Sequence, residues 1–457
     1  MNAMLPIDFC ESAPAASARR FLVAVGTVLM VNLKIFAADN AADWPPLPDC
    51  SNTNTQSVDG RVIECFTHGC SQWGCKDSRQ THFFLVHPKK GGENAPLCVV
   101  LHSANRSALD YLDYFFLNRN VDPADRCDHI PDDFYTLFLD SNNAEWWGWS
   151  DASHDRNKYS KEPTPAEKRV LASVEWVAAK FAIDRNRIYL TGTSMGGCGS
   201  LGIGLPHGDV FAAVRVFVPA GTEYVSCRMG LAPAPAADAT KAQQDAWLKT
   251  ISPAGRADPP PVVDLSARND SWSKDQGTLL NAARDGRFSL FFGWGNFGHT
   301  SAFSSIGKYP RCATVLALPW MEIRKNVAYP VFTHALTDQR PPWSNKPDAS
   351  DDTGQINGYF RWSCLADTSS DFAMRLWLEH PVADSLPPGV PNESVADITF
   401  RRVQHFKVEP NKNYEWRLIR SGETVASGVI LPDADGLLTI PKATITIAPA
   451  ELCLKPR

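Results

Sequence analysis

One short segment, Gly192-Thr193-Ser194-Met195-Gly196-Gly197, limits the possible folds of this chain most strongly. It directly follows a predicted strand, residues 187–190, and precedes a run of small residues that can begin a helix. A turn from strand to helix this tight is strained and crowded, so the positions two residues either side of the serine must lack a side chain if its hydroxyl is to be exposed. Ser194 is therefore the candidate nucleophile.

Strands and helices alternate around this segment. Residues 166–181 have helical spacing, with Val170, Val174, Val177 and Ala178 on one face. Alternating strands and helices imply right-handed crossovers and a mostly parallel sheet flanked by helices, an α/β fold. Short apolar runs predict strands at residues 61–66, 81–87, 97–102, 134–139, 187–190, 261–266 and 288–292.

The pattern changes beyond Pro341-Pro342, where turn-separated strands predict a small all-β sandwich-like domain. Arg420-Ser421-Gly422-Glu423 predicts a hairpin turn within it. The expected strands are residues 359–362, 372–378, 398–403, 414–419, 424–431 and 443–447. The expected divisions are a signal peptide at 1–38, a catalytic domain at 39–310, a linker or packing segment at 311–342 and the sandwich at 343–457.

The N-terminus has the three parts of a secretory signal. A basic pair, Arg19-Arg20, precedes an apolar stretch from 21 to 31, and the small residues Ala37 and Ala38 offer a cleavage site. An uncleaved anchor is the alternative, but Asn32 and Lys34 interrupt the apolar run well short of the roughly 20 residues that a spanning helix needs. We expect a secreted or periplasmic protein without membrane insertion after cleavage.

Twelve cysteines, eleven after loss of Cys10 with the signal, agree with export and predict disulfides. A metal cluster of Cys65, Cys70 and Cys75 is the alternative, but no Cys-x-x-Cys pair is present and an oxidising compartment favours bridges, so no metal is expected. An odd number leaves one thiol unpaired, and Cys98, within an apolar run, is the candidate for a buried one.

A serine nucleophile needs a base held by an acid, in the chain order Ser, Asp, His on loops after successive strands. Asp270 follows the predicted strand at 261–266, and Asp275 is the alternative acid. His299 follows the predicted strand at 288–292 and comes after Gly295 and Gly298; its alternative role is that of an ordinary surface histidine. The oxyanion donors are expected to be the N–H of Met195 and that of Ser103 or Ala104, in the loop after residues 97–102.

These motifs, with Asp184-Arg185-Asn186-Arg187-Ile188-Tyr189-Leu190-Thr191 before the turn, resemble α/β-hydrolase serine esterases related to polyhydroxybutyrate depolymerases, feruloyl and acetylxylan esterases, and the prolyl oligopeptidase catalytic domain. The resemblance spans about residues 61–310. It implies the α/β-hydrolase fold, the Ser194, Asp270 and His299 triad and no cofactor. Those relatives mostly carry His-Gly where this chain has His102-Ser103, so the oxyanion loop departs from their pattern.

Several tryptophans indicate a flat substrate, such as a sugar ring or an aromatic acyl group, although any one of them can instead be a core residue. Those expected at the substrate site are Trp146, Trp147, Trp149, Trp272 and Trp294. Trp377 and Trp416 could face outward from the sandwich and hold a polymer, or pack within it.

The expected function is hydrolysis of a carboxylic ester, with polymeric and carbohydrate-linked esters among the expected substrates. The alternatives are a prolyl-oligopeptidase-like peptidase and a catalytically inactive binding protein on a hydrolase fold. A formal net charge of -5 gives no electrostatic reason for a nucleic-acid partner, and no oligomeric state is predicted.

Overall fold

A computed structural model describes most of the chain downstream of its first 46 residues. The described residues belong to one compact unit, Ala42–Arg457. They are residues 47, 50–69, 73, 81–117, 130–141, 146, 163–219, 258–272, 276–339, 353–379 and 391–457.

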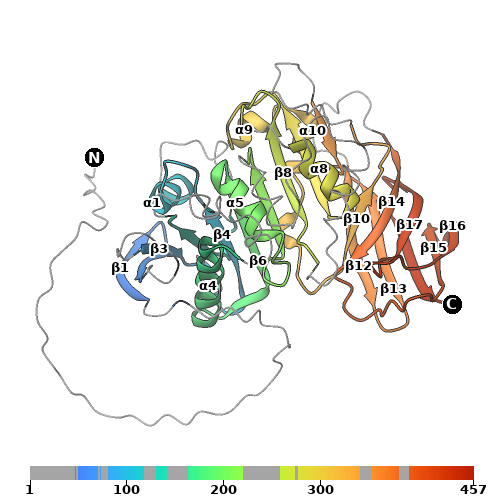
Figure 1. The fold of residues 1–457 in the computed structure, drawn as a ribbon, viewed down its shortest axis with the longest axis horizontal. Coiled ribbons are helices and arrows are strands. Elements are labelled where there is room, and N and C mark those ends of the chain that lie inside the picture. Colours follow the sequence, from blue (N-terminus) through green and yellow to red (C-terminus); the bar gives the residue numbers. More distant parts are fainter. Residues whose placement is uncertain are drawn as a thin grey trace, which may run out of the picture. The chain divides into compact units, whose positions relative to one another are not determined.

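A ten-stranded mixed sheet forms the first part of this unit, in the order β1-β2-β3-β5-β4-β6-β7-β8-β9-β11 (Figure 1). The six neighbours from β5 to β9 are parallel, whereas β1, β2, β3 and β11 pair antiparallel with their neighbours. The strands are β1 (Ser51–Val58), β2 (Arg61–His68), β3 (Thr81–Val86), β4 (Ala95–Leu101), β5 (Tyr135–Leu139), β6 (Ile183–Thr193), β7 (Ala213–Phe217), β8 (Val262–Ala267), β9 (Leu290–Gly295) and β11 (Gly354–Ile356). The predicted α/β class is confirmed.

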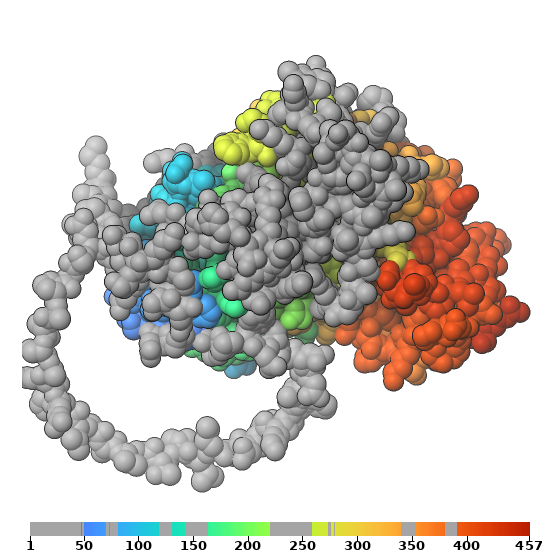
Figure 2. Space-filling model, in the orientation of Figure 1, coloured from blue at the N-terminus to red at the C-terminus, as the bar shows by residue number. Residues whose placement is uncertain are grey.

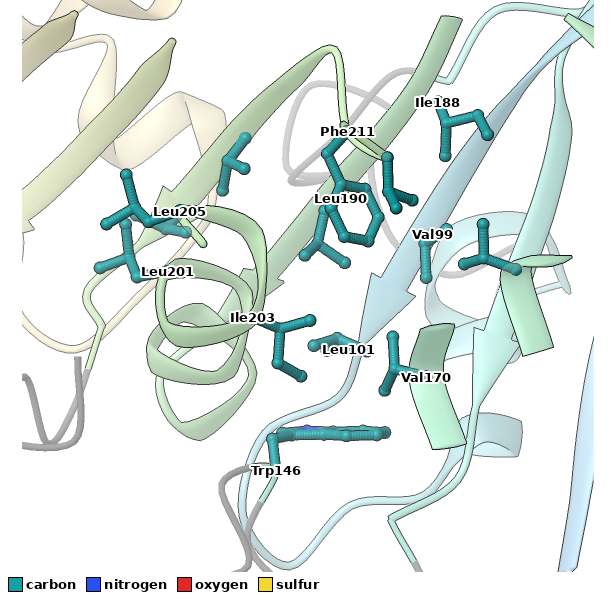
Figure 3. Close-up of a cluster of buried hydrophobic side chains, with 14 of the residues drawn as sticks. Val99, Leu101, Trp146, Val170, Ile188, Leu190, Leu201, Ile203, Leu205 and Phe211 are labelled. Atoms are coloured by element: carbon teal, nitrogen blue, oxygen red, sulfur yellow. The ribbon is translucent and has the colours of Figure 1, made fainter. Parts of the chain in front are cut away.

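Helices cover the sheet because alternate strand residues present an apolar face to them. Helix α4 begins at a capping box formed by Thr164 and Glu167, and it buries the predicted apolar face that contains Val170. These side chains join one core with Leu101 and Ile203, as Figure 3 shows. The helical elements are α1 (Ala108–Leu112), η2 (Asp113–Leu117), α4 (Pro165–Lys180), α5 (Met195–Gly204), α8 (Gln276–Asp285), α9 (Phe303–Ile306), α10 (Pro310–Leu316) and η4 (Trp320–Glu322).

Two antiparallel sheets form the β domain, which confirms the predicted C-terminal architecture. Their orders are β10-β14-β17 and β12-β13-β18-β15-β16, and their side chains share a second core. The predicted hairpin turn joins β15 and β16, where Arg420 pairs with Glu423 and Ser421 and Gly422 have positive φ angles of 52° and 83°. The strands are β10 (Tyr329–Thr333), β12 (Phe360–Asp367), β13 (Phe372–Leu378), β14 (Glu393–Arg401), β15 (Tyr414–Arg420), β16 (Glu423–Ile430), β17 (Thr439–Thr446) and β18 (Ala450–Pro456).

Two strands connect the large sheet and the sandwich across the expected linker. β10, within residues 311–342, pairs with β14 of the sandwich. β11, within residues 343–457, instead adds to β9 at the edge of the large sheet. The domain limits stay a prediction. Near them, β10 belongs to the sandwich, whereas β11, which follows it in the chain, belongs to the large sheet.

Two neighbouring arginines fasten the sandwich to the large sheet. The Arg402 side chain donates to the carbonyls of Ala212, Phe211 and Gly208, at 2.6, 2.6 and 3.1 Å. Arg401 pairs with Asp258 at 2.8 Å. Figure 2 shows the C-terminal strands in orange and red. Because Arg402 is only 5% exposed, water cannot replace its bonds.

His68, the last residue of β2, is 1% exposed, and burial together with the positive charge of Arg169 lowers its pKa to about 4. A histidine whose pKa is lower when folded stabilises the fold above its unfolded pKa of 6.5 and loses that stabilisation as the pH falls. Because the folded state resists protonation of His68, we expect this residue to lower the free energy of unfolding by about 3 kcal/mol as the pH falls from 6.5 to 4. Urea unfolding of the wild type and His68→Gln at both pH values measures this, and equal pH dependence in the two proteins would contradict it.

Among the residues that the structure describes, the cysteines with free thiols include Cys98, Cys312, Cys364 and Cys453. Cys98 is fully buried, which confirms the prediction of a buried unpaired thiol, and burial raises its pKa to about 12. Cys70 and Cys75 lie outside the described residues, so disulfides in that region stay a prediction.

The expected signal peptide at 1–38 also lies outside the described residues. Among the residues that are described, no helix combines the length and apolarity needed to cross a bilayer.

Candidate active site

Ser194 lies on a sharp turn between β6 and α5. Its φ and ψ angles, 58° and −119°, are sparsely populated for a residue with a side chain. A Cβ on Gly192 would lie 2.4 Å from the Gly196 carbonyl, and a Cβ on Gly196 would lie 2.0 Å from the Leu101 carbonyl oxygen. The glycines are needed because backbone crowds both positions, as the motif predicts.

The structure brings the three predicted triad residues together from three loops. His299 Nε2 is 2.8 Å from Ser194 Oγ, and His299 Nδ1 is 2.7 Å from Asp270 Oδ2. The side chain of Asp270 is 1% exposed, whereas that of His299 is 35% exposed. A buried carboxylate that accepts from Nδ1 leaves Nε2 free to accept the serine proton.

Asn269 connects the loop of the acid to the loop of the base. Its Oδ1 accepts from the N–H of Gly298 at 2.9 Å, and Gly298 has a φ angle of 69°. Asp270 Oδ1 accepts from the N–H of Trp272 at 3.0 Å. These hydrogen bonds fix the position of Asp270 relative to His299. Nothing in the sequence singles out Asn269 except its place before the predicted acid.

The expected oxyanion donors lie on two adjoining segments. Met195 is the first residue of α5, so its N–H has no acceptor within the helix. The close approach of Gly196 to the carbonyl oxygens of Leu101 and His102 places this helix terminus against the loop that carries Ser103 and Ala104. The two predicted sources of backbone donors are therefore neighbours.

His102 is a structural residue of this loop. Its Nδ1 lies 2.8 Å from the Ser103 carbonyl oxygen, and its Nε2 accepts from the N–H of Ser141 at 3.0 Å. Those contacts require a neutral ring with the proton on Nδ1. Burial lowers the pKa of His102, which keeps the ring neutral.

Two of the expected substrate tryptophans are core residues, which corrects their assignment. Trp146 is 1% exposed, donates to the His102 carbonyl at 2.8 Å, and lies against Gly199, which leaves room for its ring. Figure 3 shows its indole beside Val170. Trp294 is also 1% exposed and lies over Gly354 of β11. In both places a facing glycine makes the space that the indole fills.

Trp272 remains at the surface beside the acid, with 63% of its area exposed. Trp147, Trp149 and the alternative acid Asp275 lie outside the described residues, so their roles stay predictions.

The sandwich tryptophans differ from each other. Trp416 is 8% exposed in the sandwich core, with Gly428 beneath its ring, so of the two alternatives it packs within the sandwich. Trp377 is half-buried and lines a cavity of about 410 Å³ with Trp362, Leu318 and Ile323. Of Trp377 and Trp416, Trp377 is the one that lies at a cavity.

Asp270→Asn is expected to lower kcat for an ester by about 10⁴, because the amide favours the wrong imidazole tautomer. Asp275→Asn, which changes the alternative acid, is expected to keep kcat within about twofold. Initial rates with p-nitrophenyl acetate measure both. A larger loss in the Asp275 variant would transfer the role of the acid to Asp275.

Residues 148–284 match the family model described as "Putative esterase", a range that contains Ser194 and Asp270 and ends before His299. No curated protein matches the chain in sequence.

Solved structures similar to this chain include an S-formylglutathione hydrolase from Staphylococcus aureus, at 12% identity and TM-score 0.38, covering 57% of this chain and 99% of that one. A fluorophosphonate-binding serine hydrolase from the same organism has 13% identity and TM-score 0.36, covering 56% and 98%. A ferulic acid esterase has 12% identity and TM-score 0.34, covering 56% and 96%. Likeness at these identities and TM-scores does not extend to a substrate.

The parallel sheet and the strand–turn–helix around Ser194 are those of the α/β-hydrolase fold. The chain is similar to esterases of that fold, which confirms the resemblance found in the sequence.

Proposed function

We propose that this protein is a serine hydrolase that cleaves carboxylic esters through an acyl-serine intermediate. The hydrogen-bonded chain from Ser194 through His299 to Asp270, at 2.8 and 2.7 Å, carries the proposal. The "Putative esterase" match over residues 148–284 supports an ester as the substrate.

In the first half-reaction Ser194 Oγ attacks the carbonyl carbon of the ester while His299 Nε2 takes its proton. The oxygen of the tetrahedral intermediate accepts from the N–H of Met195 and from that of Ser103 or Ala104. His299 then gives its proton to the departing alkoxide, which leaves as an alcohol. The product is an ester of Ser194 with the acyl group.

In the second half-reaction His299 Nε2 removes a proton from water, which attacks the acyl carbonyl. Collapse of the second tetrahedral intermediate returns that proton to Ser194 Oγ and releases the carboxylic acid. Asp270 stays ionised throughout and stabilises the imidazolium.

A panel of acyl esters and prolyl peptides tests this substrate class. We expect ester turnover to exceed peptide turnover by at least about 10². Faster cleavage of a prolyl peptide would replace the esterase with a peptidase. Failure of the protein to turn over either class would favour a binding protein on an inactive hydrolase fold.

Trp272 is the described aromatic residue best placed to contact a flat acyl or sugar group, because it is exposed beside Asp270. A polymeric or carbohydrate-linked ester is accordingly part of the proposal.

Export, directed by residues 1–38, is also proposed, and Edman sequencing of protein from the culture medium or periplasm is expected to begin near Asp39.

A further inference from the structure

The side chain of Ser103 occupies the place where the resembling esterases mostly carry glycine, and the mechanism above uses only its backbone. Ser103 Oγ donates to the carbonyl oxygen of Thr193 at 2.9 Å and lies 2.5 Å from the hydroxyl of Tyr111. A carbonyl can only accept, so the single proton of Ser103 is used on Thr193 and Tyr111 must donate to Ser103. The order of donation is therefore Tyr111 to Ser103 to Thr193.

This chain of hydrogen bonds joins three segments that meet at the nucleophile. Thr193 is the last residue of β6 and directly precedes Ser194, Ser103 lies in the loop after β4, and Tyr111 lies in α1. Ser194 N–H, which belongs to the same peptide unit as the Thr193 carbonyl, donates to the Phe217 carbonyl of β7 at 2.9 Å. The strained turn is thus held by β7 on one side and by the oxyanion loop on the other.

We propose that Ser103 and Tyr111 are positioning residues that fix the oxyanion loop relative to the nucleophile. The inference rests on the proposed esterase function. A glycine at position 103 would leave the loop free to move with respect to Ser194, whereas the Ser103 hydroxyl ties it to the peptide next to the nucleophile. Misplacement of reacting groups by about 1 Å can lower the rate by about 10², so the hydrogen bond from Ser103 to Thr193 is expected to affect the rate of catalysis.

The hydrogen bond from Ser103 to Thr193 positions the oxyanion donors. These donors stabilise the transition state more than the bound ester, because they bond most strongly to the developing negative charge. Removal of the hydroxyl should therefore lower kcat and leave KM nearly unchanged. A residue with a purely structural role would lower stability without this division between kcat and KM.

The test compares Ser103→Ala and Ser103→Gly with Ser103→Thr, which keeps a hydroxyl. With p-nitrophenyl acetate we expect the first two to lower kcat by about 10- to 100-fold with KM within about twofold, and the threonine variant to retain at least about half of kcat. Ser289→Ala is the matched control, because Ser289 is 2% exposed and its Oγ donates to the carbonyl of Pro330 at 3.2 Å, away from these loops. It should keep kcat while lowering the thermal midpoint.

Tyr111→Phe completes a double-mutant cycle with Ser103→Ala. It also tests the same chain of hydrogen bonds if a Ser103 variant does not fold. We expect Tyr111→Phe to lower kcat by about threefold or more alone and to have a smaller effect in the Ser103→Ala background. Wild-type kcat in Ser103→Ala and Ser103→Gly, or full additivity of the two changes, would overturn the proposal. If Ser194→Ala retained the activity, the esterase function itself would fail; full dependence on Ser194 without dependence on Ser103 would overturn the positioning role alone.

Discussion

Ser194→Ala is expected to lower kcat/KM for p-nitrophenyl acetate by about 10⁴ or more. The hydroxyl is the group on which His299 acts, at 2.8 Å from Nε2, and no acyl-enzyme can form without it. Removal of a triad nucleophile leaves only the catalysis that comes from the oxyanion donors and binding, about 10³ to 10⁴ above water. Steady-state rates at several substrate concentrations give the comparison.

Ser173→Ala is the control for this substitution. Ser173 is fully buried in α4, where its hydroxyl donates to the Arg169 carbonyl at 2.8 Å. It should alter stability slightly and leave the rate unchanged. Wild-type activity in Ser194→Ala, or equal losses in the two variants, would contradict the assignment of the nucleophile.

Removal of residues 343–457 is expected to prevent the rest of the chain from folding. A chain that ends at Pro342 would lose β11 from the edge of the large sheet and leave β10 without its partner β14. It would also lose Arg402, whose guanidinium satisfies three backbone carbonyls near the start of β7. Soluble expression and circular dichroism measure the result, and a folded, active short chain would show that the sandwich is dispensable.

A graded version of this prediction keeps the whole chain. Arg402→Met is expected to lower the unfolding free energy by about 3–5 kcal/mol, because it leaves three buried carbonyls without donors. Arg375→Met, which removes an ion pair to Glu451 with both side chains 45% exposed, should cost less than about 1 kcal/mol. Similar losses in the two variants would show that Arg402 does not hold the two bodies together.

The sequence predicted those parts of the fold whose pattern is local. Strand β13 begins and ends at the predicted residues because its apolar side chains alternate without interruption. β7 was not predicted, since Arg215 interrupts its apolar run, and β1 was not predicted, since its residues are polar. β11, at three residues, is a strand only because the edge of β9 lies beside it.

In the candidate site, too, features with a local sequence pattern could be predicted and features that depend on packing between distant segments could not. Ser194, Asp270 and His299 could be predicted because each follows a strand in the order the fold requires. The burial of Trp146 and Trp294 could not, because it depends on Gly199 and Gly354, which are far from them in the sequence and make room for their rings. The contact of Ser103 with Tyr111 and Thr193 also depends on packing between separate segments.

Labelling with a fluorophosphonate probe, followed by mass spectrometry of the tryptic peptides, tests the central claim most directly. The probe phosphonylates a serine only where a base activates the hydroxyl and donors stabilise the product, so it reports the assembled site without knowledge of the substrate. We expect a single adduct on Ser194 in the wild type, and none in Ser194→Ala or in heat-denatured protein. An unlabelled native protein, or an adduct on another serine, would contradict the account.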